Sequence, residues 1–286
     1  MAKQKRVSLF FSDDWTRLEK EVLGHRVRFF RKGENIAKIT ITPSRLPFLK
    51  KNWLGGFWCP GTGVGFYSPD PKEAGTFYKE IRRHMSGVIQ GISNVEVKGV
   101  SSPSLTRIVD ISRKDPTTSF TRKRRNSIRQ GIKRGVVVRT VDEPEKAADI
   151  IFGIKARYEY WGRDKNEVLK VLEYGLKKKL MKLFVSYVDE KPVAEALFLL
   201  WNRRMNYSIS GFLRDHSWYQ PTDVLIWEAM SWGRKHGFRE MDMMGGAAQG
   251  VGGINRFKGG FGGQIEKRYF LKEVKLGPLS YRFHQS

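Results

Sequence analysis

The sequence predicts a mixed α/β fold, because segments with the spacing of amphipathic helices are interspersed with short segments that alternate like strands. The order of segments in residues 183–271 gives a second indication: three strands in close succession precede a helix, a strand, a short helix and a last strand. With 286 residues, 40% hydrophobic and 13% aromatic, the chain can bury one large core or two medium ones.

Residues 1–111 form the first predicted unit. Residues 25–43 alternate apolar and polar side chains on both sides of the turn "RKGEN", which predicts two strands. The aromatic, glycine-rich stretch "GGFWCPGTGVGFYSP" predicts a strand and a tight loop. Residues 71–91 have helical spacing and end in a glycine, and "NVEVKGV" and "TRIVDIS" are typical of strands.

A basic helix follows the composition shift at residue 112, where the second predicted unit (112–271) begins. Residues 121–139 contain eight basic residues and no acid. At about 100° per residue, four of the cations share one stripe of the helix surface: Arg122, Arg125, Arg129 and Lys133. Ile128 and Ile132 lie beside the stripe and are expected to face the core. Such a stripe can follow the phosphates of a nucleic acid, or it can be a solvated helix face.

The remainder of the second unit is predicted to hold helices at 143–161 and 165–182, followed by the strands "LFVSYVD", "VAEALFLLW" and "MNYSISGF". The helix "VLIWEAMSWGRKHG" is expected to be capped by Thr222 or Asp223 and to end at Gly237. The strands "REMDMM" and "QIEKRYFL" complete the unit. Residues 272–286 are expected to return to the first unit, because their apolar side chains need a surface to cover.

Charge is the strongest signal in the composition. The chain has 53 Lys and Arg against 29 Asp and Glu, a net charge of +24. This excess favours polyanionic partners such as tRNA, a nucleotide-linked or diphosphate-linked substrate, or an anionic membrane face, although a generally basic proteome or plain solubility explains it too. The single Cys59 excludes an intramolecular disulfide, and no apolar run approaches the ~18 residues of a membrane span. We therefore expect a cytoplasmic protein.

The segment "INRFKGGFGG" carries the most specific chemistry. It places Lys258 between Phe257 and Phe261, next to glycines that begin with Gly259. In a glycine-rich turn the ammonium and open backbone N–H groups would suit a phosphate or an oxyanion. The alternative is an ordinary lysine on a surface hairpin.

Two acids are further candidates. Glu195 interrupts an apolar strand face, so it is either a general base with a raised pKa or one half of a structural ion pair. Asp242 stands near the end of a strand beside the glycine-rich loop, where it could orient an acceptor amine or simply hold the loop.

These motifs, in this order, resemble the GNAT acyltransferase fold and, within it, the Fem family of aminoacyl-tRNA-dependent peptidyl transferases. "TRIVDIS" followed by "FTRKRRNSIRQGIKRGVVVR" resembles the family's junction between two GNAT-like lobes. "WEAMSWGRKHGFREMDMMGG" followed by "INRFKGGFGG" resembles its helix, strand and glycine turn. The resemblance implies two lobes with mixed, mostly antiparallel sheets, the first being 1–111 with the returning tail and the second 112–271.

The resemblance also implies a function: transfer of an aminoacyl group from aminoacyl-tRNA to an amine of a peptidoglycan precursor. It places Lys258 at the substrate site, assigns Arg157 to the diphosphate of the acceptor, and puts Tyr207 on the strand that lines the same cleft. No dedicated cofactor or metal is implied.

Two other functions stay open at this stage. A GNAT-type enzyme could use acyl-CoA or another donor on a polysaccharide or small amine, although the CoA signature Q/R-x-x-G-x-G/A is replaced here by "LRDHSWYQPTD". The other open function is that of a non-catalytic RNA-binding module, with the basic helix as its binding surface.

Overall fold

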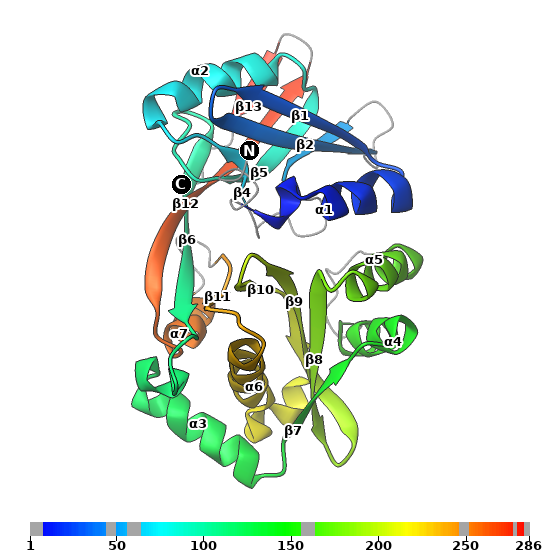
Figure 1. The fold of residues 1–286 in the computed structure, drawn as a ribbon, viewed down its shortest axis with the longest axis vertical. Helices are drawn as coiled ribbons and strands as arrows, with labels where there is room; N and C mark the ends of the chain where they lie inside the picture. The colour runs from blue at the N-terminus through cyan, green and yellow to red at the C-terminus, as the bar shows by residue number, and fades with distance from the viewer. Residues whose placement is uncertain are drawn as a thin grey trace. The chain divides into compact units, whose positions relative to one another are not determined.

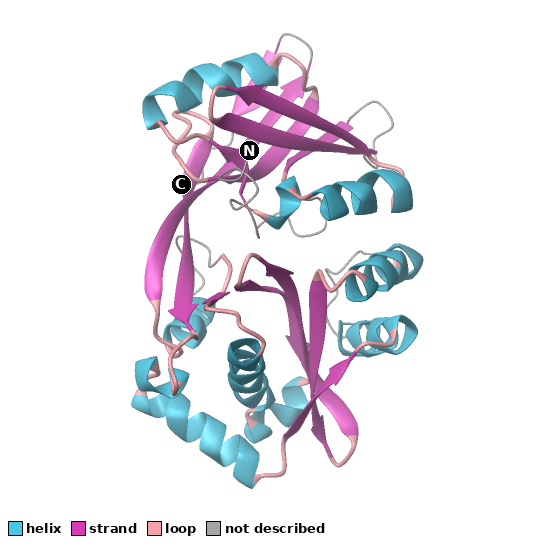
Figure 2. Cartoon of the chain, viewed as in Figure 1, coloured by secondary structure: helices cyan, strands magenta, loops and turns pink. Residues whose placement is uncertain are grey.

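The computed structural model of the protein describes residues 8–43, 50–55, 64–155, 164–245, 252–276 and 279–282, which form two compact units (Figures 1 and 2). Unit 1 holds the described residues up to Thr106, together with Gly245 and those from Glu266 onwards. Unit 2 holds the described parts of Arg107–Met244 and of 252–265. The unit boundary falls inside two long strands, β6 (Ser101–Asp110) and β12 (Gln264–Leu276), so each strand belongs to both units.

Unit 1 is a mixed sheet with flanking helices. Its helices are the short 3-10 helix η2 (Leu9–Phe11), α1 (Asp13–Arg17), which continues into the π-helix η3 (Leu18–Val22), and α2 (Pro71–Arg82). Its strands are β1 (Arg26–Lys32), β2 (Asn35–Pro43), β3 (Lys50–Leu54), β4 (Val64–Tyr67), β5 (Gly87–Ser93) and β13 (Leu279–Arg282). The strand order is β1-β2-β3-β5-β12, and only β3 and β4 run parallel to β5.

The predicted hairpin of residues 25–43 is confirmed as β1 and β2, but two other predictions for this unit are wrong. Helix α2 ends at Arg82, and residues 87–91 belong to β5, since burial on alternate positions of that strand overrides the helical spacing. Residues 94–100 form turns rather than a strand. Gly99 has a φ of 75°, and the N–H of Val100 donates to the carbonyl of Val97, which closes a turn.

Unit 2 contains the larger set of helices. They are the short turn η4 (Pro116–Ser119), α3 (Arg122–Lys133), α4 (Pro144–Lys155), α5 (Lys165–Lys177), the short turn η5 (Arg214–Tyr219), α6 (Pro221–Lys235) and α7 (Gly252–Gly259). Its strands, besides the ends of β6 and β12, are β7 (Val137–Val141), β8 (Met181–Val188), β9 (Lys191–Trp201), β10 (Arg204–Phe212) and β11 (Glu240–Asp242).

The unit 2 sheet has the order β6-β11-β10-β9-β8-β7, and it is antiparallel except for the parallel pair β10 and β11. Figure 1 shows α4 and α5 on one side of β8 and β9 and α6 on the other, with α3 beyond α6. The main core joins apolar side chains of α6, such as Leu225 and Met230, to Phe184, Phe198 and Met205 of the sheet. Nearly every residue of β9 is buried, which explains its almost continuous apolar sequence.

The helix ends in unit 2 differ in detail from the predictions. Helix α5 ends at Lys177, because residues 181–182 already belong to β8. Helix α6 begins at Pro221 after Gln220, whose φ is 55°, so neither Thr222 nor Asp223 is the cap. The predicted end at Gly237 is confirmed by a φ of 79°, the left-handed conformation that suits glycine there.

Helix α3 is confirmed, with Thr121 as its N-cap. Ile128 is buried as expected, but Ile132 is 46% exposed. The core-facing direction of α3 passes through Gly131, where an added Cβ would lie 2.5 Å from Val224 of α6. Ile132 is one residue further round the helix and therefore lies outside the contact.

The glycines after α7 form the turn that leads into β12. Gly262 and Gly263 have φ values of 73° and 85°. A Cβ on Gly262 would lie 2.1 Å from the carbonyl oxygen of Ser119, and one on Gly263 would lie 2.4 Å from that of Ile108. The turn therefore packs against backbone on two sides, and only glycine fits both positions.

We expect Gly262→Ala to lower the free energy of unfolding by about 2 kcal/mol or more, because positive φ and a backbone clash act together. Gly259→Ala is the matched control: the φ of Gly259 is not positive, and its added Cβ would lie 3.7 Å from Arg107, an ordinary contact. Urea unfolding of both variants measures the difference. Equal midpoints would contradict the described turn.

Candidate active site

Lys258 lies on α7, not in the turn that the sequence predicted. Its ammonium donates a hydrogen bond to the carbonyl of Met244 at 2.7 Å, and it lies 5.9 Å from the centre of the Tyr207 ring. Met244 follows β11 and has a φ of 57°. The lysine therefore joins α7 to the end of β11 and the aromatic face of β10.

Burial lowers the pKa of Lys258 to about 8, and the carboxylate of Asp242 opposes this shift. Asp242 is fully buried and accepts the N–H of Met244 at 2.9 Å. Its other oxygen is 4.0 Å from the guanidinium of Arg204. Asp242 thus holds Met244, whose carbonyl accepts the hydrogen bond from Lys258. Its negative charge also stabilises the protonated form of Lys258, which burial destabilises.

Tyr207 completes this group. Its side chain is 8% exposed, its hydroxyl donates to Ser210 at 2.6 Å, and its ring lies 5.6 Å from that of Phe198. The pairing of β10 with β9 shifts register between Tyr207 and Ile209, which is a β-bulge. Bulges re-aim side chains at the ends of a ladder. The structure thus brings together three of the predicted residues: Lys258, Asp242 and Tyr207.

Glu195 lies further along the sheet. It is fully buried in the middle of β9, opposite Val185 of β8 and Gly211 of β10. Gly211 is four residues from Tyr207, about 13 Å at the rise of a strand. A role for Glu195 as general base stays a prediction, and Arg157 lies outside the described residues.

Phe257 and Phe261 do not enclose Lys258, which corrects the prediction. They enclose Arg124 of α3, whose guanidinium carbon lies 4.5 Å from the centre of each ring. The same guanidinium forms a salt bridge with Asp223 of α6 and donates to the carbonyl of Phe257 at 2.8 Å. Burial lowers the pKa of Arg124 to about 10, so it stays charged at neutral pH.

Arg124 is the functional-region residue that sequence reasoning missed. A signal was present: Arg124 precedes the buried Ile128 by four residues, which puts both on one face of α3. The side chains of Arg124 and Asp223 are only 11% and 7% exposed. The basic segment of residues 121–139 therefore contains a cation, Arg124, that serves an internal contact and not the surface.

The glycine-rich backbone does not offer a row of open N–H groups, which corrects a second expectation. The N–H groups of Gly260, Phe261 and Gly262 each donate to carbonyls at the end of α7. Gly259 needs no special conformation, as its modest Cβ contact shows. The glycines thus terminate the helix and set its position, and the ammonium of Lys258 is the ligand-binding candidate.

The predicted cationic stripe is only partly a free surface. Arg122, Arg129 and Lys133 are exposed. Arg125 is half-buried and donates to the carbonyl of Phe120 at the start of its own helix. Three exposed cations therefore remain on this face.

One segment of the chain is similar to a known family. Residues 119–258, which include the whole Lys258 group, match the family model described as an acetyltransferase (GNAT) domain. No curated protein matches the sequence. The Lys258 group therefore lies in a segment that is similar to GNAT acetyltransferase domains.

Several solved structures have the same fold as this chain. The structure of FemX is 14% identical, with a TM-score of 0.64 over 92% of this chain and 91% of that one. The C-terminal domain of a putative lysylphosphatidylglycerol synthetase from Agrobacterium fabrum is 14% identical, with a TM-score of 0.59 over 94% and 90%. A tandem GNAT protein from the clavulanic acid biosynthesis pathway is 11% identical, with a TM-score of 0.52 over 85% and 80%. The predicted Fem-like GNAT fold is confirmed.

Within the part of the chain that the structure describes, no helix has both the length and the apolar character to cross a membrane.

We expect Arg124→Met to lower the free energy of unfolding by about 3–5 kcal/mol, because it leaves the buried carboxylate of Asp223 without its cation. Arg122→Met, at an exposed position of the same helix, should change stability by less than about 0.5 kcal/mol. Adding Asp223→Leu to Arg124→Met should recover part of the loss. If the two single variants unfold at the same urea concentration, the buried pair does not hold the helices together.

The Lys258 ammonium should titrate near pH 8 when followed through its Cε resonance in protein with ¹³C-labelled lysine. Asp242→Asn should lower this pKa further, whereas Glu240→Gln, two residues away on β11, should not. Because the folded-state pKa lies below the unfolded value, wild type should gain stability over Lys258→Met as pH rises from about 8 to about 10.5. A titration near pH 10.5 would refute the buried environment.

Proposed function

We propose that the protein transfers an aminoacyl group from aminoacyl-tRNA to an amine of a peptidoglycan precursor. The observation that carries this proposal is Lys258: a largely buried ammonium, held by Met244 beside Asp242 and Tyr207, within the GNAT-type domain. The segment around it, "INRFKGGFGG", is also where the sequence resembles the Fem family.

The chemistry requires charge stabilisation rather than a protein nucleophile. The acceptor amine attacks the ester carbonyl of the aminoacyl-tRNA, a C–N bond forms, the ester C–O bond breaks, and the amine proton ends on the ribose hydroxyl. The intermediate carries an oxyanion. With a pKa of about 8, Lys258 is mostly protonated at neutral pH and can donate a charge-assisted hydrogen bond to that oxygen. Asp242 favours the charged form that this role needs.

The start of α6 supports a donor other than acyl-CoA. A pyrophosphate bound at a helix N-terminus needs open N–H groups and often glycines. Here the residue at the first helical position is Pro221, which has no N–H, and Asp223 places a carboxylate in the first turn. Residues 213–220 contain no glycine. These features fit a protein that needs no CoA.

The charge of the chain and the exposed cations of α3 support tRNA as the carrier of the donor. Arg122, Arg129 and Lys133 are exposed on a helix whose segment has no acid, and the chain has a net charge of +24. Polyanion binding by such surfaces releases counterions and is salt-dependent. Arg157 stays the candidate for the acceptor's diphosphate on the resemblance alone.

A lipid acceptor is a second candidate, because one structure with this fold is named as the C-terminal domain of a putative lysylphosphatidylglycerol synthetase. Another is named L-PGS, from Bacillus licheniformis, with a TM-score of 0.53. Both acceptors would use the same donor, so the first experiment concerns the donor. The acceptor can then be varied between peptidoglycan precursors and phosphatidylglycerol.

We expect labelled aminoacyl groups to pass from charged tRNA to the acceptor, and Lys258→Met to lower kcat about 100-fold or more, since one lost oxyanion donor typically costs about 3–4 kcal/mol. A loss confined to KM would instead mean that Lys258 only binds substrate. Lys267→Met is the matched control, because Lys267 is an exposed lysine 5.2 Å from the ring centre of Tyr269. Turnover of acetyl-CoA but not of charged tRNA would refute the proposed donor, and RNA binding without any turnover would favour a binding module.

A further inference from the structure

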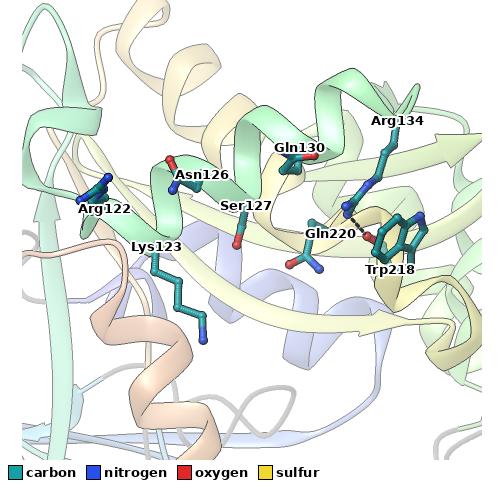
Figure 3. A pocket seen from close by; sticks show the side chains of 8 residues that line it. All are labelled: Arg122, Lys123, Asn126, Ser127, Gln130, Arg134, Trp218 and Gln220. Atoms are coloured by element: carbon teal, nitrogen blue, oxygen red, sulfur yellow. Dashed lines mark hydrogen bonds between the residues drawn. The ribbon is translucent and has the colours of Figure 1, made fainter.

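A second exposed face of α3 lines an open hollow of about 560 Å³, and of its lining residues the function proposed above uses only Arg122. Figure 3 shows Lys123 and Ser127 projecting from the helix towards it and Arg134 beside the indole of Trp218. Eight residues line it: Arg122, Lys123, Asn126, Ser127, Gln130, Arg134, Trp218 and Gln220. At about 100° per residue this face is centred about 100° from the stripe of Arg129 and Lys133. It is a separate surface that shares only Arg122 with the stripe.

Trp218 is the unusual residue of this hollow. It lies on η5 and is 65% exposed, the most exposed of the large hydrophobic side chains that the structure describes. The guanidinium of Arg134 lies 3.5 Å from the ring centre and also donates to the carbonyl of Trp218. Arginine thus holds one region of the indole in place while most of the ring surface stays open to solvent. A ring that is fixed but exposed is a stacking platform.

The other lining residues complement a nucleotide. Arg122, Lys123 and Arg134 supply positive charge for phosphates, and three amides also line the hollow: Asn126, Gln130 and Gln220. The Asn126 oxygen accepts from Arg129 and the Gln220 nitrogen donates to the carbonyl of Ser217, but each amide group has a second N–H and a second lone pair for base edges. None of the eight residues is acidic. Cations, amides and an open aromatic ring are the combination with which proteins bind unpaired nucleotides.

We propose that this hollow binds a single-stranded segment of RNA, with one base stacked on Trp218 and the adjacent phosphates on Arg122 and Lys123. Unpaired nucleotides are required, because a base inside a duplex offers no open face for stacking. An anionic membrane suits the hollow less well: it has a single large apolar side chain, and its amides would lose water without gaining partners. The site does not depend on the donor proposed above, although any unpaired stretch of a tRNA would satisfy it.

The test compares three ligands with the full chain: a fluorescent single-stranded oligouridine of eight nucleotides, an RNA duplex of equal length, and vesicles containing phosphatidylglycerol. Trp218→Ala should weaken binding of the single strand at least about tenfold, and Trp218→Phe should restore most of it, because a ring still stacks. Phe29→Ala removes another exposed aromatic side chain, 39% exposed on β1, and should change nothing.

A stripe variant separates this site from general electrostatics. Arg129→Glu with Lys133→Glu should weaken the duplex and the single strand by similar factors, whereas Trp218→Ala should affect the single strand selectively. Unchanged oligouridine binding by Trp218→Ala would overturn the proposal, as would an equal loss for duplex and single strand. A loss of vesicle binding alone would assign the hollow to a membrane surface instead. Lys258→Met should bind oligouridine normally, so failure of the transfer reaction and failure of this site are distinguishable.

Discussion

The arrangement of unit 2 depends on one buried cation, the guanidinium of Arg124. It belongs to α3, its carboxylate partner Asp223 belongs to α6, and the two rings that enclose it come from α7 and the turn after it. A planar guanidinium can present its faces to Phe257 and Phe261 while its edge forms the salt bridge with Asp223 and donates to the Phe257 carbonyl, which an ammonium cannot do. One charge thus fixes three helices that are far apart in the sequence.

The clamp on Arg124 also decides where Lys258 points. Phe257 lies on α7 and Phe261 in the turn after it, both rings contact Arg124, and Lys258 is about 100° round the helix from Phe257. With the aromatic face held against α3, the lysine is directed to the carbonyl of Met244 after β11. The glycines then end the helix in a turn that packs against Ser119 and Ile108. The structural cation Arg124 therefore positions the candidate catalytic cation Lys258. It does so by contacting Phe257 and Phe261, the two rings that the sequence had placed around Lys258.

Much of the fold was predictable, because hydrophobic period and segment order are local properties of the chain. The prediction errors occur where tertiary contacts override these local patterns. In residues 87–91 the apolar side chains have helical spacing, but the segment pairs with β3 and β12 in a sheet. At the site, the sequence predicted Lys258, Asp242 and Tyr207, which the structure places together, but it assigned the wrong neighbours to the lysine. Adjacency in sequence does not say which side chain an aromatic ring faces, and the bond to Met244 spans fourteen residues. Placing Lys258 within the short helix predicted before the last strand would have directed Phe257 and Lys258 about 100° apart.

The absence of acids from residues 121–139 acquires a specific meaning in this structure. An isolated helix with so many cations would repel itself, but α3 is anchored by a carboxylate from another helix and by a buried apolar face. Because Asp223 neutralises the internal cation and is buried, it does little to screen the outer cations. Because the anchoring carboxylate comes from α6, α3 needs no acid of its own. It keeps two exposed faces, the cationic stripe and the hollow with Trp218, and their charge is available to a polyanion. The net charge of the chain alone carries no such information, since it counts buried and exposed cations alike.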